Sequence, residues 1–253
     1  MTTAYLDNAI PSILRFGRLV HKIGRWCFGS RGPHPRRVRF GNLRRTTPIS
    51  RNWGQDRGRA LDRYYIEKFL DENRADIRGR VLEIGDAHYT RKYGGTRVVS
   101  SDVLHVNEGN PQATIIADLT CAEHIPDSSF DCIILTQTLQ LIFDVPAALR
   151  TIRRILKPGG TILATFPGIT HTGDAEWGSS WCWSFTRNSA RRLFHPIFGE
   201  SNVCLDSYGN VLAATAFLYG LADRELEPAE LEVHDPAYDV IIAVKAVRPA
   251  DPL

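Results

Sequence analysis

The stretch Arg80–Gly85, which reads RVLEIG, constrains the fold of this chain more than any other. Three of its residues are the large aliphatic side chains that a strand buried on both faces contains. Glu83 and Gly85 then place a carboxylate and a bare backbone at the carboxyl end of that strand. Ligands bind outside the carboxyl ends of the strands in an open parallel sheet. We therefore expect a cofactor site directly after this strand.

Further apolar runs alternate with amphipathic segments along the rest of the chain, and the helix pattern at 145–156 is stopped by LKPGG. Strands separated by helical connections predict a parallel sheet wound by right-handed crossovers. Strands are expected at residues 81–84, 97–101, 113–116, 130–135, 161–166, 203–207 and 238–247, and helices at 61–73, 145–156, 186–194 and 211–221.

Acidic residues are expected at the ends of three of these strands. Glu83 and Asp102 are about 20 residues apart, the spacing at which a dinucleotide-type fold places a carboxylate on a ribose diol. A carboxylate suits that role because it accepts two hydroxyl hydrogen bonds. Asp118, after the third strand, can accept a hydrogen bond from the exocyclic amine of adenine. We expect the three carboxylates to converge on one adenosine-shaped hollow.

The motifs VLEIG, SSD, ADL, FDCIILTQTL and LKPGG together resemble those of class I S-adenosylmethionine-dependent methyltransferases of the type-11 group, from roughly Leu61 to Val247. The resemblance implies an α/β, Rossmann-like fold with a seven-stranded, mostly parallel sheet and helices on both faces. It also implies S-adenosyl-L-methionine as the cofactor. In this reading Glu83 and Gly85 lie near the methionine end, Asp102 on the ribose hydroxyls, Asp118 with Leu119 at the adenine, and Thr136 beside the sulfonium. The predicted cofactor contacts also include Asp86, Val103, Arg57 and Tyr64.

The first motif departs from the family pattern, which usually runs E-x-G-x-G-x-G. Here Gly85 is followed by DAHY, so two glycines that let the backbone approach a ligand are absent. Either the loop is reshaped, with Gly94 and Gly95 turning the chain later, or cofactor binding is lost. The remaining acids favour the reshaped loop. The same shortage of glycine argues against a nicotinamide dehydrogenase, whose pyrophosphate needs that turn.

A long polar stretch at 167–183 leaves the fifth expected strand near the methyl donor and holds three tryptophans. Loops on a rigid scaffold carry recognition, and aromatic faces beside polar groups suit a sugar ring. Trp177, Trp181 and Trp183 are therefore candidate substrate contacts, or they only pack the loop. Methyl transfer to a hydroxyl needs a base, for which His171 is the first candidate and Asp174 the second.

The stretch PISRNWGQDRG followed by LDRYYIEKF, together with NEGNPQATIIADLT, resembles a subgroup of these methyltransferases. That subgroup is similar to enzymes that act on sugars in bacterial polysaccharide or glycosylated natural-product pathways. The resemblance implies methylation of a hydroxyl or an amine on a sugar-containing small molecule, with O- and N-transfer both open. A surplus of acids after Thr170 would attract a cationic acceptor such as an aminoglycoside, or would pair with the basic N-terminal arm. A catalytically silent scaffold and a membrane-surface module are the alternatives from other classes.

Residues 1–48 form a basic arm that precedes the predicted methyltransferase domain at 49–253. Residues 10–28 have the pattern of a basic amphipathic helix, which either packs on its own domain or contacts an anionic membrane face or a partner. Without a nucleic-acid-binding motif, a nucleic-acid partner is not expected. Five cysteines with no CxxC pair make a metal site or disulfide framework unexpected. No apolar run approaches the ~20 residues of a membrane span, so a cytoplasmic location is expected.

Overall fold

The computed structural model describes residues 39–173 and 178–250. The chain divides into two compact units, Met1–Arg45 and Thr46–Leu253. The described part of the first unit contains one helical turn, η1 (Gly41–Leu43). The amphipathic helix expected at 10–28 lies outside the described residues.

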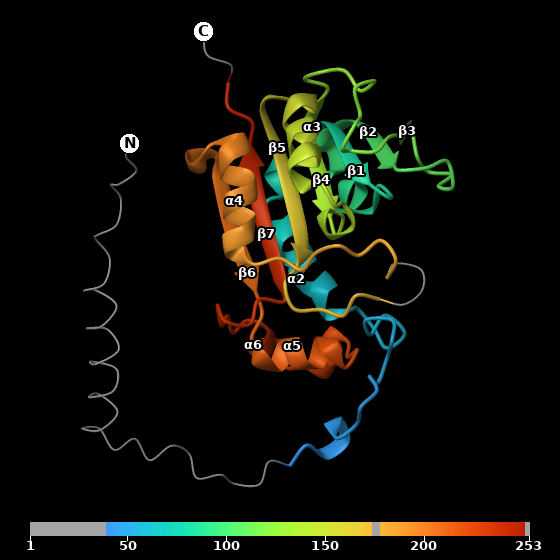
Figure 1. Cartoon of the computed structure of the whole chain (residues 1–253), viewed down its shortest axis with the longest axis vertical. Helices are drawn as coiled ribbons and strands as arrows, with labels where there is room; N and C mark the ends of the chain where they lie inside the picture. The colour runs from blue at the N-terminus through green and yellow to red at the C-terminus, as the bar shows by residue number, and fades with distance from the viewer. Residues whose placement is uncertain (1–38, 174–177, 251–253) are drawn as a thin grey trace, which may run out of the picture. The chain divides into compact units, whose positions relative to one another are not determined.

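Seven strands of the described residues form one sheet in the order β3-β2-β1-β4-β5-β7-β6 (Figure 1). All neighbouring strands from β3 to β5 are parallel, whereas β7 runs antiparallel to both β5 and β6. The predicted seven-stranded, mostly parallel sheet is therefore confirmed. The strands are β1 Gly79–Ile84, β2 Val98–His105, β3 Ile115–Ile116, β4 Phe130–Thr136, β5 Leu156–Pro167, β6 Val203–Tyr208 and β7 Ile241–Val247.

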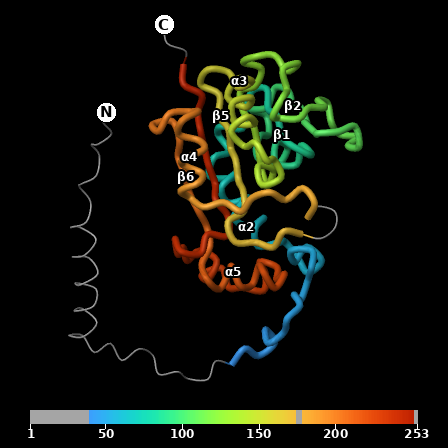
Figure 2. Tube along the Cα trace, in the orientation of Figure 1, coloured from blue at the N-terminus to red at the C-terminus, as the bar shows by residue number. Residues whose placement is uncertain are grey.

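Helices cover both faces of the sheet, as the path of the chain in Figure 2 shows. On one face, α3 (Val145–Ile155) and α4 (Arg187–Phe198) share a core with the sheet. The other face is covered by α2 (Leu61–Glu72), α5 (Val211–Leu218) and α6 (Pro228–Leu231). Within residues 39–173 and 178–250, no helix has the length and apolar character needed to cross a membrane.

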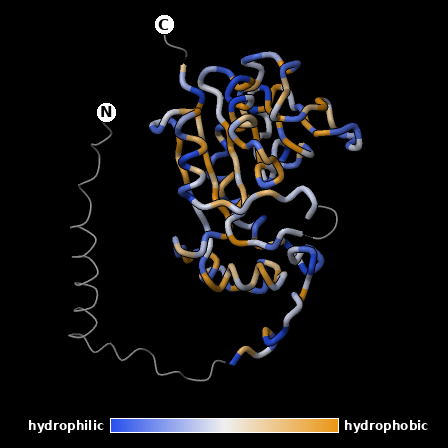
Figure 3. Tube along the Cα trace, viewed as in Figure 1, coloured by the Kyte–Doolittle hydropathy of each residue, from blue (hydrophilic) through white to orange (hydrophobic). Residues whose placement is uncertain are grey.

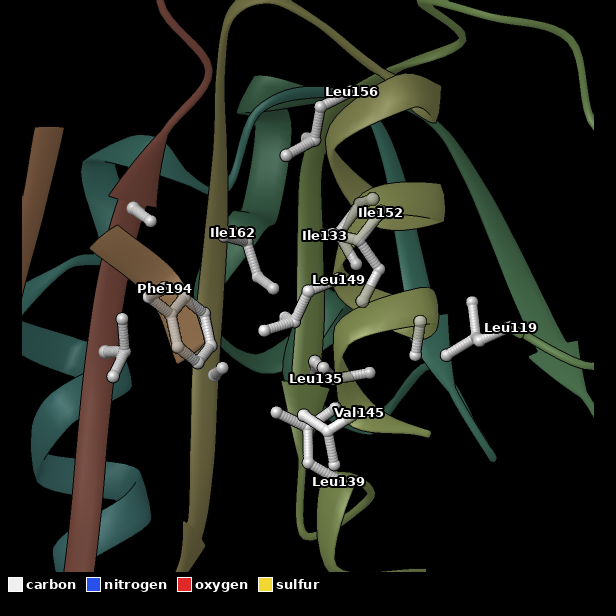
Figure 4. Close-up of a cluster of buried hydrophobic side chains, with 14 of the residues drawn as sticks. Leu119, Ile133, Leu135, Leu139, Val145, Leu149, Ile152, Leu156, Ile162 and Phe194 are labelled. Atoms are coloured by element: carbon white, nitrogen blue, oxygen red, sulfur yellow. The ribbon is translucent and has the colours of Figure 1, made fainter. Parts of the chain in front are cut away.

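The α3 helix shows why the sequence builds this packing. Its N-cap is Asp144, whose carboxylate accepts a hydrogen bond from the backbone N–H of Ala147 at 2.9 Å. Leu149 and Ile152 lie on the apolar stripe that follows and pack toward Ile133 of β4 (Figure 4). The hydrophobic residues in Figure 3 are concentrated in the strands and on the helix sides that face them. Burial of this stripe holds α3 against the sheet.

Two strand boundaries differ from those expected by four residues or more. We expected the second strand to end near Asp102, but β2 continues to His105 because Val103 and Leu104 are buried and Leu104 pairs with Ile115. We expected the fifth strand to begin after the KPGG turn, but β5 begins at Leu156 and includes those residues. The first difference changes which side chains lie at the carboxyl end of the sheet.

Candidate cofactor site at the carboxyl end of the sheet

Glu83, near the end of β1, is 2% exposed and binds the chain that follows it. Its carboxylate accepts hydrogen bonds from the backbone N–H of Tyr89 at 3.0 Å and of Thr90 at 2.7 Å, and from the Thr90 hydroxyl at 2.7 Å. Burial raises the pKa of Glu83, against the lowering effect of these hydrogen bonds. Both oxygens are therefore used to hold the helical turn after β1, and contact of Glu83 with a cofactor stays a prediction.

The placement expected for Asp102 is wrong. In the structure Asp102 pairs in register with Leu82 in the middle of β1, three residues before the end of β2. Its carboxylate binds Arg80 Nε at 2.8 Å and the Thr114 hydroxyl at 3.0 Å. The spacing from Glu83 was right, but β2 extends further than its polar start suggested. His105 is the residue that ends β2.

The residues predicted at the adenine lie just beyond β3. Asp118 is exposed, and its Oδ1 accepts hydrogen bonds from the backbone and hydroxyl of Thr120, each at 2.8 Å. Leu119 is buried in the core under α3, where Figure 4 shows it. Val103 is also buried, and its N–H donates to the Thr114 hydroxyl at 3.0 Å. Asp102 thus lies before the end of its strand, whereas convergence of Glu83, Asp102 and Asp118 on one ligand stays a prediction.

The loop after β1 is built around Gly85, whose φ of +89° is a conformation that favours glycine. A Cβ added to Gly85 would meet nothing within 4 Å, so open space adjoins its backbone. The Gly85 carbonyl accepts a hydrogen bond from Asn110, and Asp86 accepts one from the N–H of His88 at 2.7 Å. A helical turn, η3 (Thr90–Gly94), then leads to Gly95, which also has a positive φ of +56°. The open backbone at Gly85 fits close approach of a cofactor.

A buried polar cluster that the sequence analysis did not single out lies at the start of α2. Asp62 is 9% exposed, and Arg63 donates from Nη1 to the hydroxyl of buried Tyr89 at 3.2 Å. Burial raises the pKa of the Asp62 carboxyl, while neighbouring Arg63 and His171 act in the opposite direction. A sequence signal was present, because Asp62 falls in the apolar stripe of α2 that also contains Tyr65.

His171, the first candidate for the base, is stacked against Trp53 with ring centroids 4.4 Å apart. Its Nδ1 accepts a hydrogen bond from the N–H of Gly173 at 3.1 Å, and its Nε2 is buried. The neutral ring therefore carries its proton on Nε2, and Nδ1 can take a substrate proton only after the bond to Gly173 breaks. Catalysis by His171 stays a prediction. Asp174, the second candidate, lies outside the described residues.

Arg57 and Tyr64 were also predicted to contact the cofactor. Arg57 forms an ion pair with Glu225 at 2.5 Å, and the Tyr64 hydroxyl donates to Glu232 at 2.6 Å. These contacts bind the chain around α2 to the segment near α6, which is a different role from the predicted one. Sequence alone did not indicate these partners, because they lie 168 residues away along the chain.

The segment after β5 meets the chain that follows β4. Backbone N–H groups of Cys182 and Trp183 donate to the carbonyl of Gln140 at 2.8 and 3.1 Å. The Trp183 indole donates to the Ile142 carbonyl at 3.0 Å and stacks with Phe143 at 5.7 Å. Phe143 is 76% exposed and Trp183 39%, so this aromatic pair faces solvent.

The other predicted residues of this region have different surroundings. Trp181 is half-buried, and its Nε1 has no hydrogen-bond partner in the part of the chain that the structure describes. Thr136 ends β4 and pairs in register with Thr165 of β5. Gln137, which follows it, has a positive φ of +47°, an uncommon conformation for this residue. Trp177 lies outside the described residues.

Gly85→Ala tests the open backbone. We expect the variant to bind S-adenosylhomocysteine about tenfold more weakly or worse, because the new methyl group would enter the space beside the strand end. Calorimetric titration measures the affinity. Gly159→Ala is the matched control, since Gly159 has a φ of +78° and equally open surroundings but lies at the start of β5. Equal affinity of the two variants would contradict the assignment of Gly85 to the site.

The chain was compared with curated sequences and with solved structures. No curated protein sequence matches the chain. Among solved structures, an S-adenosylmethionine-dependent methyltransferase from Mesorhizobium loti is similar at 16% identity, over 75% of this chain and 98% of that one, with a TM-score of 0.47. One from Archaeoglobus fulgidus is similar at 12% identity, over 78% and 94%, with a TM-score of 0.47. The cyclase SpnF is similar at 16% identity, over 76% and 82%, with a TM-score of 0.49.

One protein-family model matches the central part of the chain. Residues 87–164 match the model of the type-11 methyltransferase family, which is described as a methyltransferase domain. The matched segment runs from the turn after β1 through β2, β3, β4 and α3 into β5. Residues 87–164 are therefore similar to a methyltransferase domain and form the central strands of a Rossmann-like sheet, and S-adenosyl-L-methionine is the cofactor that such a domain implies.

Proposed function

We propose that this protein transfers a methyl group from S-adenosyl-L-methionine to a hydroxyl or an amine of a sugar-containing small molecule. The observation that carries the proposal is the match of residues 87–164 to a methyltransferase domain, on a sheet whose first strand ends at an unobstructed glycine backbone. When bound, the cofactor supplies an electrophilic methyl group on a sulfonium. The protein has to bind it at Gly85, exclude water and align the acceptor.

The stacked pair of Phe143 and Trp183 supports a sugar-containing acceptor. An exposed aromatic face suits the C–H face of a sugar ring, and a fixed indole loses little freedom on binding. Phe143 follows β4 and Trp183 belongs to the segment after β5, so the pair joins the chain beyond two neighbouring strand ends.

The support for a cationic acceptor is weaker than the sequence suggested. Several acids after Thr170 already pair with basic side chains of the same unit, which reduces the charge available to attract a ligand. These pairs are Glu225 with Arg57, Asp223 with Arg59, Glu232 with Lys68, and Asp239 with Arg187. We therefore propose an acceptor that carries a hydroxyl or an amine, without requiring a strong positive charge.

A methyltransferase-like scaffold without catalytic activity is the second candidate. The observation that favours it is that both carboxylates already have protein partners, Glu83 in the turn after β1 and Asp102 at Arg80. Non-catalytic use of the fold would need no methyl donor. The two candidates differ in whether the protein binds the cofactor product.

Calorimetric titration of the full chain with S-adenosylhomocysteine separates the two candidates. We expect one site per chain, and an absence of heat at millimolar ligand would support the scaffold.

A radiolabelled methyl donor should then label an aminoglycoside or a neutral glycoside, and mass spectrometry of the product identifies oxygen or nitrogen as the acceptor atom. Trp183→Ala should raise KM for the acceptor while affinity for S-adenosylhomocysteine stays unchanged. Labelling of non-glycosylated acceptors alone would contradict the proposed substrate class.

A further inference from the structure

The first turn of α2 contains two residues of opposite charge, Asp62 and Arg63, whose side chains have few hydrogen-bond partners. Asp62 is 9% exposed, and its hydrogen bond in the described structure comes from the backbone N–H of Arg63 at 2.7 Å. The Arg63 side chain has one hydrogen bond there, from Nη1 to the Tyr89 hydroxyl at 3.2 Å. Most of the hydrogen-bonding capacity of this carboxylate and this guanidinium is therefore unused among the described residues.

Such an arrangement is costly unless something else compensates the charges. Removing a charged group from water costs several kcal/mol, which a close ion pair or several hydrogen bonds must offset. No ion pair within 4.0 Å joins Asp62 and Arg63 to each other, or either of them to another described side chain. Asp86 acts on Arg63 electrostatically without such contact. The protein alone leaves both groups incompletely compensated.

The titration behaviour of the two groups agrees with this reading. Burial raises the pKa of Asp62, so its charged form is poorly stabilised when the site holds only protein. For Arg63, burial acts against the charged form, but Asp62 and Tyr89 raise the pKa, and the guanidinium stays ionised. A bound cation beside Asp62 and a bound anion beside Arg63 would supply what each lacks.

The pair is placed at the cofactor end of the sheet. Tyr89, which Arg63 contacts, belongs to the turn after β1 that Glu83 holds. Asp62 is close enough to His171 for the two to interact electrostatically, and His171 is covered by the ring of Trp53. Asp62 and Arg63 thus lie between the loop at the end of β1 and the segment after β5.

We propose that Asp62 and Arg63 form a binding subsite for a zwitterion, in which the Asp62 carboxylate binds an ammonium group and the Arg63 guanidinium binds a carboxylate. An α-amino-acid group has this chemistry, with its two charges on neighbouring atoms. It can come from the amino-acid end of the cofactor or from an amino-acid acceptor. The first source rests on the proposed function, and the second does not.

Calorimetry with two nucleosides tests the subsite in the full-length protein. S-Adenosylhomocysteine carries the amino-acid group, and 5′-methylthioadenosine lacks it. We expect Arg63→Gln and Asp62→Asn each to weaken S-adenosylhomocysteine at least about tenfold, because each loses a charge-assisted contact. Binding of 5′-methylthioadenosine should change less than about twofold, since it makes neither contact. Equal losses for the two nucleosides, or unchanged affinity for S-adenosylhomocysteine, would overturn the proposal.

Matched controls separate binding from folding. Arg91→Gln removes an exposed cation from the same turn as Tyr89 and should leave both affinities unchanged. Circular dichroism melting of each variant shows whether it folds. Asp62→Asn is chosen over Asp62→Ala because it keeps the shape of the side chain. A loss of S-adenosylhomocysteine affinity in Arg91→Gln equal to that in Arg63→Gln would overturn the assignment to Arg63.

A separate experiment tests an amino-acid acceptor as the source of the zwitterion. If the wild-type protein binds neither nucleoside, the proposed cofactor function fails, and L-methionine and L-ornithine are then tested by thermal shift. A rise in Tm that Arg63→Gln abolishes and Arg91→Gln keeps supports the subsite without the cofactor. No rise in Tm with either amino acid, together with no nucleoside binding, overturns the subsite as well.

Discussion

Glu83→Ala should lower the free energy of unfolding by about 3 kcal/mol, because three buried donors lose a charged acceptor at once. The N–H groups of Tyr89 and Thr90 begin the turn after β1, and water cannot replace the carboxylate at a position that is 2% exposed. We expect the affinity for S-adenosylhomocysteine to fall as well, since this turn carries Tyr89 beside Arg63. Urea unfolding followed by circular dichroism measures the stability.

Glu83→Gln is the matched control, because it keeps one acceptor oxygen and removes the charge. We expect it to cost less than Glu83→Ala, and its deficit should depend on pH. The pKa of Glu83 is raised in the folded state, so the proton-linked part of wild-type stability is present below the unfolded pKa and is lost as pH rises through the folded pKa. Glu83→Gln should therefore be closer to wild type at pH 7.5 than at pH 4.5. A variant Glu83→Ala as stable as wild type would contradict the structural role.

The elements that the sequence predicted well are those whose signal is local. The apolar run around Val81 and the periodicity of α3 require only neighbouring residues to be read, and both appear nearly where expected. The KPGG turn did not delay the start of β5 as expected, because Phe130 of β4 pairs with Leu156 before it. Pairing with another strand thus extended an element past a local turn signal.

The candidate site was harder to predict because its chemistry depends on partners far along the chain. Asp102 has the right spacing from Glu83, but the length of β2 depends on pairing with β3 and on contacts from Thr114. Arg57 is paired with a residue near α6, which no local pattern indicates. Residue type and spacing therefore predicted that the site lies at the carboxyl end of the sheet. Which side chains reach that end depends on pairing between residues far apart in the chain.

Much of the unused hydrogen-bonding capacity at this end of the sheet belongs to Asp62 and Arg63 of α2, which covers it. The stacked rings of Trp53 and His171 join the stretch before α2 to the segment after β5. The carboxylates on β1 and β2 stabilise the scaffold instead. Substitutions that displace the covering segments should therefore affect ligand binding more than those at the strand ends, and the junction at Gly220 provides a direct test.

Gly220→Ala should lower the free energy of unfolding by about 3 kcal/mol and displace the segment that carries Trp53. Gly220 has a φ of +73°, and its Cβ would overlap the backbone carbonyl of Ser50. The N–H groups of Ile49 and Ser50 donate to the Tyr219 carbonyl at 2.8 and 3.2 Å, so this approach joins the segment to the end of α5. A backbone oxygen cannot rotate away as a side chain can, and the whole segment has to move.

Gly159→Ala separates backbone strain from steric overlap as contributions to the loss of stability in Gly220→Ala. Its φ of +78° matches that of Gly220, but a new Cβ there meets nothing within 4 Å, so only the backbone strain of about 1 kcal/mol is expected. Urea unfolding gives the difference between the variants, and the fluorescence of Trp53, in a background where the other four tryptophans are replaced by phenylalanine, reports its contact with His171. If both substitutions cost the same, the close approach of Ser50 contributes nothing. If S-adenosylhomocysteine binds Gly220→Ala as tightly as wild type, the covering segment does not contribute to the site.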